Sequence, residues 1–338
     1  MLANNIVITT ICSFFYRNKS RNAVSKGDMT LGMMTAVQYI IGQLNAPINQ
    51  MIGFIQSAQD AKISLERLGE IHNREDEEQD EDSRITEWPA GQQAASIDLQ
   101  HVTFRYDPLG SEVLKDVSLH IPQGKVTAIV GGSGSGKTTL VKLLLGFYPP
   151  ASGEIRVGGQ PLDSYSRHFW RSRCGSVMQE GFIFSDTIAR NIAVGEEHVD
   201  TEKLLFAAEV AHIREMVEAM PLGFNTKIGQ EGNGISQGQR QRILIARAVY
   251  KNPDYLFFDE ATNALDANNE RIIMENLQQF FQGRTVLIVA HRLSTVRHAD
   301  QIVVIDNGSI VERGTHEELT ALHGAYYELV KNQLELGN

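Results

Sequence analysis

"GGSGSGKTT", residues 131–139, matches the pattern G-x-x-x-x-G-K-[ST] of a phosphate-binding loop. The apolar run "KVTAIV" directly before it predicts a buried strand, and "TTLVKLLLGF" directly after its lysine predicts a helix. A strand and a helix in this order are the context that separates such a loop from a chance glycine-rich turn. The stretch therefore predicts an α/β fold with a site for a nucleoside triphosphate.

The loop residues are candidates for phosphate binding because glycines let backbone N–H groups curl around phosphates at a helix N-terminus. The Lys137 ammonium is expected to reach the β- and γ-phosphates, and the Thr138 hydroxyl to hold Mg²⁺. The residues expected to bind the nucleotide are Gly131, Gly132, Ser133, Gly134, Ser135, Gly136, Lys137, Thr138 and Thr139.

A second group of candidate residues follows two other apolar runs. "YLFFDE" predicts a strand that ends in Asp259, placed to hold Mg²⁺, and Glu260, placed to act as general base on the attacking water. "IVAHRLS" places His291 at another strand end, where a neutral imidazole can contact the γ-phosphate. Paired acids also cap helices, and a lone histidine is usually structural, so these residues alone leave those alternatives open.

The composition restricts the partners of the chain. Its 338 residues carry 31 basic and 41 acidic side chains, a net charge of −10, and no large basic patch. This balance argues against a nucleic-acid partner. The two cysteines, Cys12 and Cys174, lack metal-ligand spacing and fit a reducing cytoplasm.

The first 72 residues differ from those that follow. Residues 29–59 contain no charged side chain, and this run is long enough to cross a bilayer of about 30 Å. Amides interrupt it, which suits a helix packed in a bundle or lining a water-filled path. We expect a partial all-α transmembrane segment whose last helix continues into water; two buried helices of a soluble domain remain the alternative.

The chain is expected to fall into four parts. The acidic run "NREDEEQDEDSR" predicts a solvated linker after the N-terminal helices. The parts are a partial transmembrane segment at 1–72, the linker at 73–95, an α/β domain at 96–334 and a tail at 335–338. Within the α/β domain, residues 186–250 have a mostly helical pattern and predict an inserted helical subdomain.

This ordered set of motifs resembles the ATPase subunit of the ATP-binding cassette (ABC) family over residues 96–334. The resemblance implies a P-loop NTPase fold that binds ATP and Mg²⁺ and hydrolyses ATP. Tyr106 matches the aromatic residue that stacks on adenine, although it shares a strand face with Val102 and Phe104 and can instead belong to the core. Gln179 matches the glutamine that contacts Mg²⁺ and the membrane domain.

The resemblance also gives a role to "GISQGQRQRILIAR", residues 234–247. In the family this signature loop commonly reads L-S-G-G-Q and contacts the γ-phosphate of ATP on the opposite subunit. Gln237 replaces a glycine of that motif, and we expect its side chain to point away from the nucleotide and to tune rather than abolish hydrolysis. The matching signature residues are Ser236, Gln237, Gly238 and Gln239.

One further loop, "ATNALD", matches the family segment after the general base. Asp266 matches an acid of the dimer interface, and Asn263 stands where serine is commoner. Because every catalytic position is present in one chain, the resemblance implies a homodimer, or a pair with a partner half-transporter, that holds ATP between the subunits.

The uncharged run and "GFIFSDTIARNI" resemble exporters whose membrane helices precede the ATPase on one chain. The resemblance implies an ATPase domain on the cytoplasmic face of a bacterial inner or plasma membrane. A complete half-transporter has more helices, so we expect a fragment, a truncated gene product or a late start. The basic residues of the loop at 17–28 conflict with the positive-inside tendency if that loop faces outward.

The expected substrate follows from resemblance alone. Residues 234–270 are most similar to the cassettes of bacterial peptide and bacteriocin exporters, so a peptide is the expected substrate. The alternatives are a lipid or drug exporter, and an orphan truncated ATPase without transport activity of its own.

Overall fold

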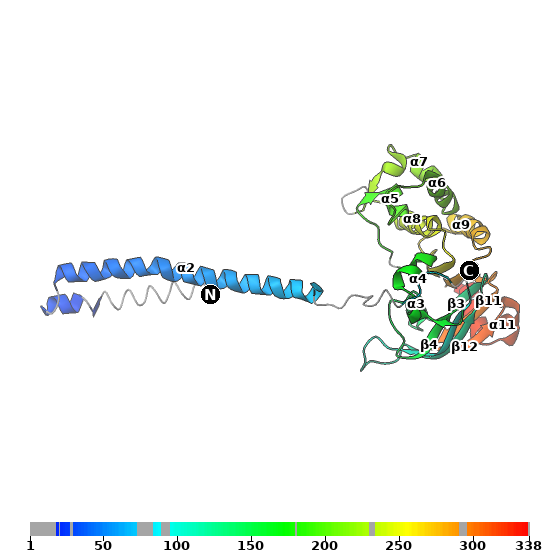
Figure 1. Cartoon of the computed structure of the whole chain (residues 1–338), viewed down its shortest axis with the longest axis horizontal. Coiled ribbons are helices and arrows are strands. Elements are labelled where there is room, and N and C mark those ends of the chain that lie inside the picture. Colours follow the sequence, from blue (N-terminus) through cyan, green and yellow to red (C-terminus); the bar gives the residue numbers. More distant parts are fainter. Residues whose placement is uncertain are drawn as a thin grey trace. The chain divides into compact units, whose positions relative to one another are not determined.

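The computed structural model describes residues 18–19, 21–27, 30–72, 84–88, 95–179, 181–229, 234–290 and 296–336. The chain divides into two compact units, Met1–Gln79 and Asp80–Asn338. The first unit contains the long helix α2, and the second contains every strand in the described ranges (Figure 1).

The first unit consists mainly of α2 (Leu31–His72), a helix of 42 residues. Thr30 caps its start, since the hydroxyl oxygen accepts a hydrogen bond from the Met33 amide at 3.3 Å. The uncharged run at residues 29–59, for which we expect a membrane span, falls largely within α2. Within the described part of the chain, no helix is both long enough and apolar enough to cross a membrane.

The second unit is built on two large sheets. The antiparallel sheet has the strand order β2-β1-β4-β5 and consists of β1 (Ile97–Phe104), β2 (Leu114–Ile121), β4 (Ser152–Val157) and β5 (Gln160–Pro161). The larger sheet has the order β12-β11-β3-β10-β9-β6 and consists of β3 (Val126–Val130), β6 (Cys174–Val177), β9 (Tyr255–Asp259), β10 (Thr285–Val289), β11 (Gln301–Asp306) and β12 (Ser309–Gly314). Its strands are parallel except for the edge strand β12. The predicted α/β fold is therefore confirmed.

Helices lie between the strands of the second unit and after its last strand, β12. In the described ranges they are α3 (Lys137–Leu144), α4 (Arg167–Arg173), α5 (Ile188–Ile192), α6 (Thr201–Val210), α7 (Arg214–Glu218), α8 (Gln237–Tyr250), α9 (Ala267–Phe280), α11 (His316–Leu322) and α12 (Ala325–Leu336), with short 3-10 turns η2 (Leu162–Ser164) and η3 (Gly223–Asn225). Helices α5 to α8 gather on one side of the unit, with a two-stranded ribbon of β7 (Asp186–Thr187) and β8 (Lys227–Ile228) (Figure 1). The inserted helical subdomain is thus confirmed.

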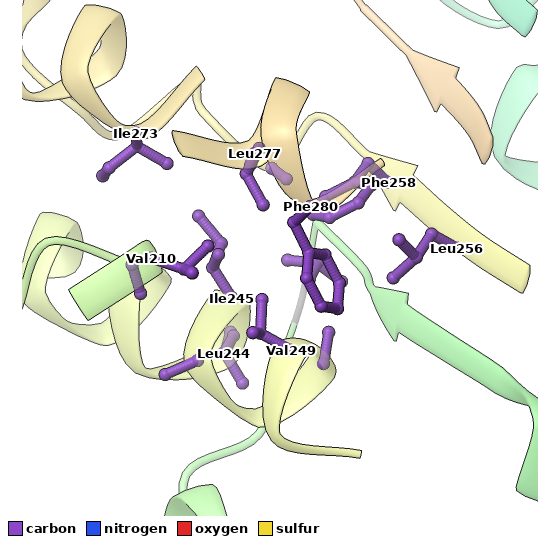
Figure 2. Packing of buried hydrophobic residues seen from close by; sticks show 14 of the residues in the cluster. Val210, Leu244, Ile245, Val249, Leu256, Phe258, Ile273, Leu277 and Phe280 are labelled. Atoms are coloured by element: carbon purple, nitrogen blue, oxygen red, sulfur yellow. The ribbon is translucent and has the colours of Figure 1, made fainter. Parts of the chain in front are cut away.

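The central strands of the larger sheet are buried on both faces, which explains their continuous apolar sequence. In β3, Ala128 and Val130 belong to a cluster with the helical subdomain, while Ile129 belongs to a cluster with the antiparallel sheet. Figure 2 shows the first cluster, in which Phe258 of β9 lies beside Leu277 and Phe280 of α9, with Ile245 and Val249 of α8 on the other side of Phe280. This packing fixes the carboxyl end of β9 against α8, which precedes it in the chain, and α9, which follows it.

Residues 84–88, which we name the strap, lie within the expected linker and pack on the second unit. The Ile85 amide donates to the Ser164 carbonyl oxygen at 2.8 Å, and the Ser166 amide donates to the Ile85 carbonyl oxygen at 2.9 Å. The Trp88 ring lies 5.3 Å from the Phe169 ring and 6.1 Å from the Tyr255 ring, measured between centroids. The strap is therefore joined to the second unit by main-chain pairing and by aromatic contacts.

Candidate functional site

The phosphate-binding loop joins the end of β3 to the start of α3. Its backbone follows a path that requires glycine at two positions. A Cβ atom on Gly131 would lie 2.1 Å from the Ile305 carbonyl oxygen. Gly136 has a φ of 104°, and a Cβ atom there would lie 2.7 Å from Leu114 Cδ2. Between these glycines, residues 132–134 are exposed. The loop thus presents backbone N–H groups at the N-terminus of α3, the arrangement that binds anions.

Lys137, the first residue of α3, is buried within this loop. Its ammonium group donates to the Gly131 carbonyl oxygen at 2.9 Å and to the Gly132 carbonyl oxygen at 2.7 Å. Burial lowers the pKa of Lys137, and the nearby carboxylates of Glu260 and Asp259 oppose that shift. The loop, its lysine and the acids Asp259 and Glu260 at the end of β9 therefore lie together at one edge of the sheet.

Asp259, the last residue of β9, is fully buried, and no hydrogen bond of good geometry reaches either of its carboxylate oxygens within the described residues. Burial raises the pKa of this carboxyl, while the nearby Thr138 hydroxyl and the Lys137 charge oppose the shift. A buried carboxylate beside a hydroxyl fits a hard divalent cation that takes one or two carboxylates and otherwise binds phosphates and water. Gln179 is exposed just after β6, the strand next to β9.

Glu260 follows directly, with a backbone φ of 53° in the left-handed region that is uncommon for a residue with a side chain. Its carboxylate oxygen Oε2 accepts a hydrogen bond from Asn263 Nδ2 at 2.6 Å. Strand β10, which pairs with β9, ends at Val289, and His291 lies outside the described residues. The carboxyl ends of β9 and β10 are neighbours, as expected for site residues of an α/β fold.

Tyr106 is half exposed, so it does not belong to the buried core, the alternative that the sequence left open. Its hydroxyl lies 3.1 Å from the Thr139 hydroxyl of α3, and its ring packs edge-on against Tyr148 at 5.4 Å. These aromatic rings border a pocket of about 500 Å³, lined by Phe104, Arg105, Tyr106, Pro108, Tyr148, Pro149, Pro150 and Ala151. Tyr148 was not predicted, although the aromatic and prolines of "FYPP" are the signal that could have found it.

The signature residues form the start of α8. Ser236 caps the helix, since its hydroxyl oxygen accepts from the Gln239 amide at 3.2 Å and its own amide donates to Gln239 Oε1 at 2.9 Å. A Cβ atom on Gly238 would lie 3.2 Å from the Ala264 carbonyl oxygen, so this glycine permits a close approach of the loop after β9. Gln237 is exposed and has no such restriction.

Gln237 lines a groove instead, together with Gln179. The groove has a volume of about 450 Å³ and is lined by Gln179, Gly181, Phe182, Gln237, Arg240, Gln241 and Leu244. The expectation that the Gln237 side chain points away from the nucleotide and tunes hydrolysis stays a prediction.

Two arginines of α8 bind the segment after Gln179, and the sequence analysis gave them no role. Arg240 donates to the Gly181 carbonyl oxygen at 2.6 Å, and Arg247 donates to the Phe182 carbonyl oxygen at 2.9 Å and the Asn191 carbonyl oxygen at 2.8 Å. Burial lowers the pKa of Arg247 to about 10, so it stays charged at neutral pH. The helix that begins with the signature residues is thus tied to the chain that leaves Gln179.

Asp266 is the N-cap of α9. Its carboxylate accepts a hydrogen bond from the Asn269 amide at 3.0 Å, and this backbone hydrogen bond is the main reason that the pKa of Asp266 is lowered. The loop from Asp259 to Asp266 therefore begins at the end of a buried strand and ends at a capped helix.

Comparison with known proteins identifies the family. A family model described as ABC transporter matches residues 114–263, a range that includes the phosphate-binding loop, the signature residues and both acids after β9. The leukotoxin translocation ATP-binding protein LktB of Mannheimia haemolytica is 40% identical over 313 residues, which cover 93% of this chain and 43% of that protein. LktB of Bibersteinia trehalosi has the same identity and coverage.

A solved structure described as a bacterial Atm1-family ABC exporter with ATP bound is also similar. It aligns with a TM-score of 0.75 at 31% identity, over 98% of this chain and 57% of that chain. The chain thus spans less than two thirds of the length of each of these relatives. The sequence, the fold and these comparisons therefore agree on an ABC transporter ATP-binding domain in the second unit.

Proposed function

We propose that this chain is the motor part of a membrane exporter, that it hydrolyses ATP with Mg²⁺, and that it acts as a dimer. The observation that carries the proposal is the gathering of Lys137, Asp259 and Glu260 at one edge of the sheet, in the loop after β3 and at the end of β9, two parallel strands on either side of β10. A phosphate-binding lysine beside a metal-binding acid and a general base is the set that phosphoryl transfer to water requires.

Nucleotide binding would use three parts of the second unit. Tyr106 would stack on the adenine ring at the mouth of the pocket it borders. The backbone amides of residues 131–139 would bind the phosphates, and Lys137 would exchange the carbonyls of its own loop for the β- and γ-phosphates. Mg²⁺ would neutralise charge on those phosphates, held by Thr138, Gln179 and the buried carboxylate of Asp259.

Hydrolysis would depend on Glu260 as general base. As the oxygen of the attacking water forms a bond to the γ-phosphorus, Glu260 takes a proton from that water. The bond from the γ-phosphorus to the bridging oxygen breaks at the same centre, and ADP leaves with the electron pair. His291 is proposed to contact the γ-phosphate and orient the water.

The dimer would complete each site from the opposite subunit. We propose that the signature residues Ser236, Gln237, Gly238 and Gln239 face ATP on the partner chain, and that Asp266 lies at the interface. The position of these residues at the N-terminus of α8 supports this, because a helix N-terminus favours an anion. Large exposed apolar side chains along α2 support further contacts with a membrane domain, and they include Leu31, Tyr39, Ile48, Met51, Phe54 and Leu65.

The exported substrate is proposed to be a peptide or a protein. The support is the 40% identity to proteins named for leukotoxin translocation, together with the resemblance of the cassette to peptide exporters. The proposed location is the bacterial inner or plasma membrane, with the ATPase domain on its cytoplasmic face.

The test is Mg²⁺-dependent ATP hydrolysis by the full chain purified in detergent. Lys137→Ala is expected to abolish nucleotide binding, and Glu260→Gln to retain binding while it lowers kcat by about 100-fold or more, the usual contribution of a general base. Lys125→Ala and Glu275→Gln are matched controls on exposed ion pairs with Asp300 and Arg271, and both should behave as the wild type. Absence of hydrolysis in the wild type, or full activity of Glu260→Gln, would contradict the proposal.

A further inference from the structure

We propose that Asn263 is a positioning residue for the reaction, and that it acts by holding the carboxylate of Glu260. Asn263 Nδ2 lies 2.6 Å from Glu260 Oε2, within hydrogen-bond distance. An ionised carboxylate only accepts hydrogen bonds, so the amide must turn its nitrogen toward it. The inference rests on the proposed role of Glu260 as general base.

Both backbone polar groups of Glu260 are hydrogen-bonded, so the contact with Asn263 bears on the position of the side chain rather than of the backbone. Its amide donates to the Val289 carbonyl oxygen of β10 at 3.1 Å, and its carbonyl oxygen accepts from the Asn263 amide at 3.3 Å. With the backbone fixed in the left-handed region, only the side-chain torsions of Glu260 remain to be set. The Asn263 amide restrains the far end of that side chain.

The turn that follows Glu260 brings the side-chain amide of Asn263 next to the Glu260 carboxylate. Residues 260 to 263 form a turn in which main chain and side chain of Asn263 both bond back to Glu260. Serine, the commoner residue at this position in the family, has a shorter side chain and carries its donor closer to the backbone. Asparagine therefore extends a donor to the carboxylate end, and this chain uses it to orient the acid that takes the proton from water.

A purely structural role for Asn263 makes a different prediction. Asparagine and aspartate are both favoured in turns, and they have nearly the same shape. If Asn263 only shaped the turn, Asn263→Asp would be tolerated. If it acts through the donated N–H, Asn263→Asp is the worst substitution, because it removes the donor and places a second negative charge beside Glu260.

The experiment measures kcat, KM and equilibrium nucleotide affinity of the full chain with Mg²⁺ and ATP. Asn263→Asp is expected to lower kcat by about 100-fold and Asn263→Ala by about tenfold, as misplaced catalytic groups do, while KM and nucleotide affinity stay near the wild-type values. Asn263→Ser, which keeps a hydroxyl donor, should fall between the wild type and Asn263→Ala. Asn268→Asp adds the same charge on the exposed first turn of α9 and is expected to leave kcat unchanged.

A double-mutant cycle separates this inference from the function on which it rests. In a Glu260→Gln background, Asn263→Asp should lower kcat by less than about twofold, since effects of residues that act as a unit are not additive. Wild-type kcat in Asn263→Asp, or an equal loss in both backgrounds, would overturn the positioning role and leave the proposed function intact. Full activity of Glu260→Gln alone would overturn the proposed function itself.

Discussion

At the scale of single residues, Asp259 shows a conflict between stability and activity. The carboxyl group is fully buried without a well-placed hydrogen bond in the described residues, and burial raises its pKa above the ordinary value of 3.8. Such a group destabilises the nucleotide-free fold, yet it is the group proposed to hold Mg²⁺. A site that binds a cation has this free-energy cost when no cation is bound.

Asp259→Asn is therefore expected to stabilise the nucleotide-free protein at neutral pH, because it replaces a buried charge by a neutral amide of nearly the same shape; each pKa unit by which burial raises a carboxyl corresponds to about 1.4 kcal/mol. The effect should depend on pH. Because the folded protein has the higher pKa, the wild type is relatively stable below pH 3.8 and loses stability as pH rises through the folded pKa. The variant lacks this loss. Thermal unfolding measured from pH 4 to pH 8 should therefore show a difference in Tm between the variant and the wild type that increases with pH. Parallel curves would contradict the explanation.

From the sequence alone, only candidate site residues that are neighbours in the chain could be placed together. Lys137 and Thr138 follow from a local motif, and Asp259 and Glu260 follow from one strand end. The contact between Tyr106 and Tyr148 could not be predicted, since it joins the end of one strand to the end of a helix. The Asn263 contact was missed for another reason: the pattern showed an uncommon residue but not the direction of its side chain.

At the scale of elements, α8 presents the signature residues at its N-terminus and binds the chain after Gln179 through its arginines. Its first turn is closed by the reciprocal hydrogen bonds of Ser236 and Gln239, and its later turns bind the chain after Gln179 through Arg240 and Arg247. The predicted helix after the signature loop is confirmed. Its partners were not predicted, because periodicity shows which face of a helix is apolar but not which carbonyl groups its arginines reach.

Two neighbouring positions in the first turn of α8 should respond differently to substitution. Gln237→Gly is expected to change ATP hydrolysis by less than about fivefold, because it removes an exposed side chain and costs about 1 kcal/mol of helix propensity. Gly238→Ala should lower hydrolysis by about tenfold or more, since its Cβ pushes on the Ala264 carbonyl oxygen at 3.2 Å and displaces the loop that carries Glu260. Steady-state hydrolysis checks both. A rise from near zero on Gln237→Gly would show that the glutamine blocks the reaction.

At the scale of the whole molecule, the two units differ in how far they bury their apolar side chains. The second unit has apolar clusters on both faces of its larger sheet, which is why alternating strands and helices could be read from the sequence. In the first unit, large apolar side chains of α2 stay exposed within this chain. The linker was expected to extend to residue 95, and the strap was not foreseen because its contacts with Ser164 and Tyr255 are distant in sequence.

The proposed dimer gives a prediction at this scale. Glu260→Gln with ATP and Mg²⁺ should hold two copies together, because nucleotide is bound but not consumed. Light scattering in detergent should then show a protein mass that rises from 37.6 kDa to twice that value on addition of ATP. Lys137→Ala should show no ATP-dependent change. An oligomeric state that ignores ATP in both variants would contradict the ATP-bridged dimer.

The strap also determines how the second unit would bear a mechanical load. A pulling force that enters the unit along its chain from residue 83 meets the Ile85 hydrogen bonds with Ser164 and Ser166 first, and the buried side of the Trp88 ring next. These contacts would have to rupture before tension reached β1, the strand that pairs with β2 on one side and β4 on the other. Until they rupture, the tension would enter the unit at Ser164 and Ser166, just after β5, and β1 would not carry it directly.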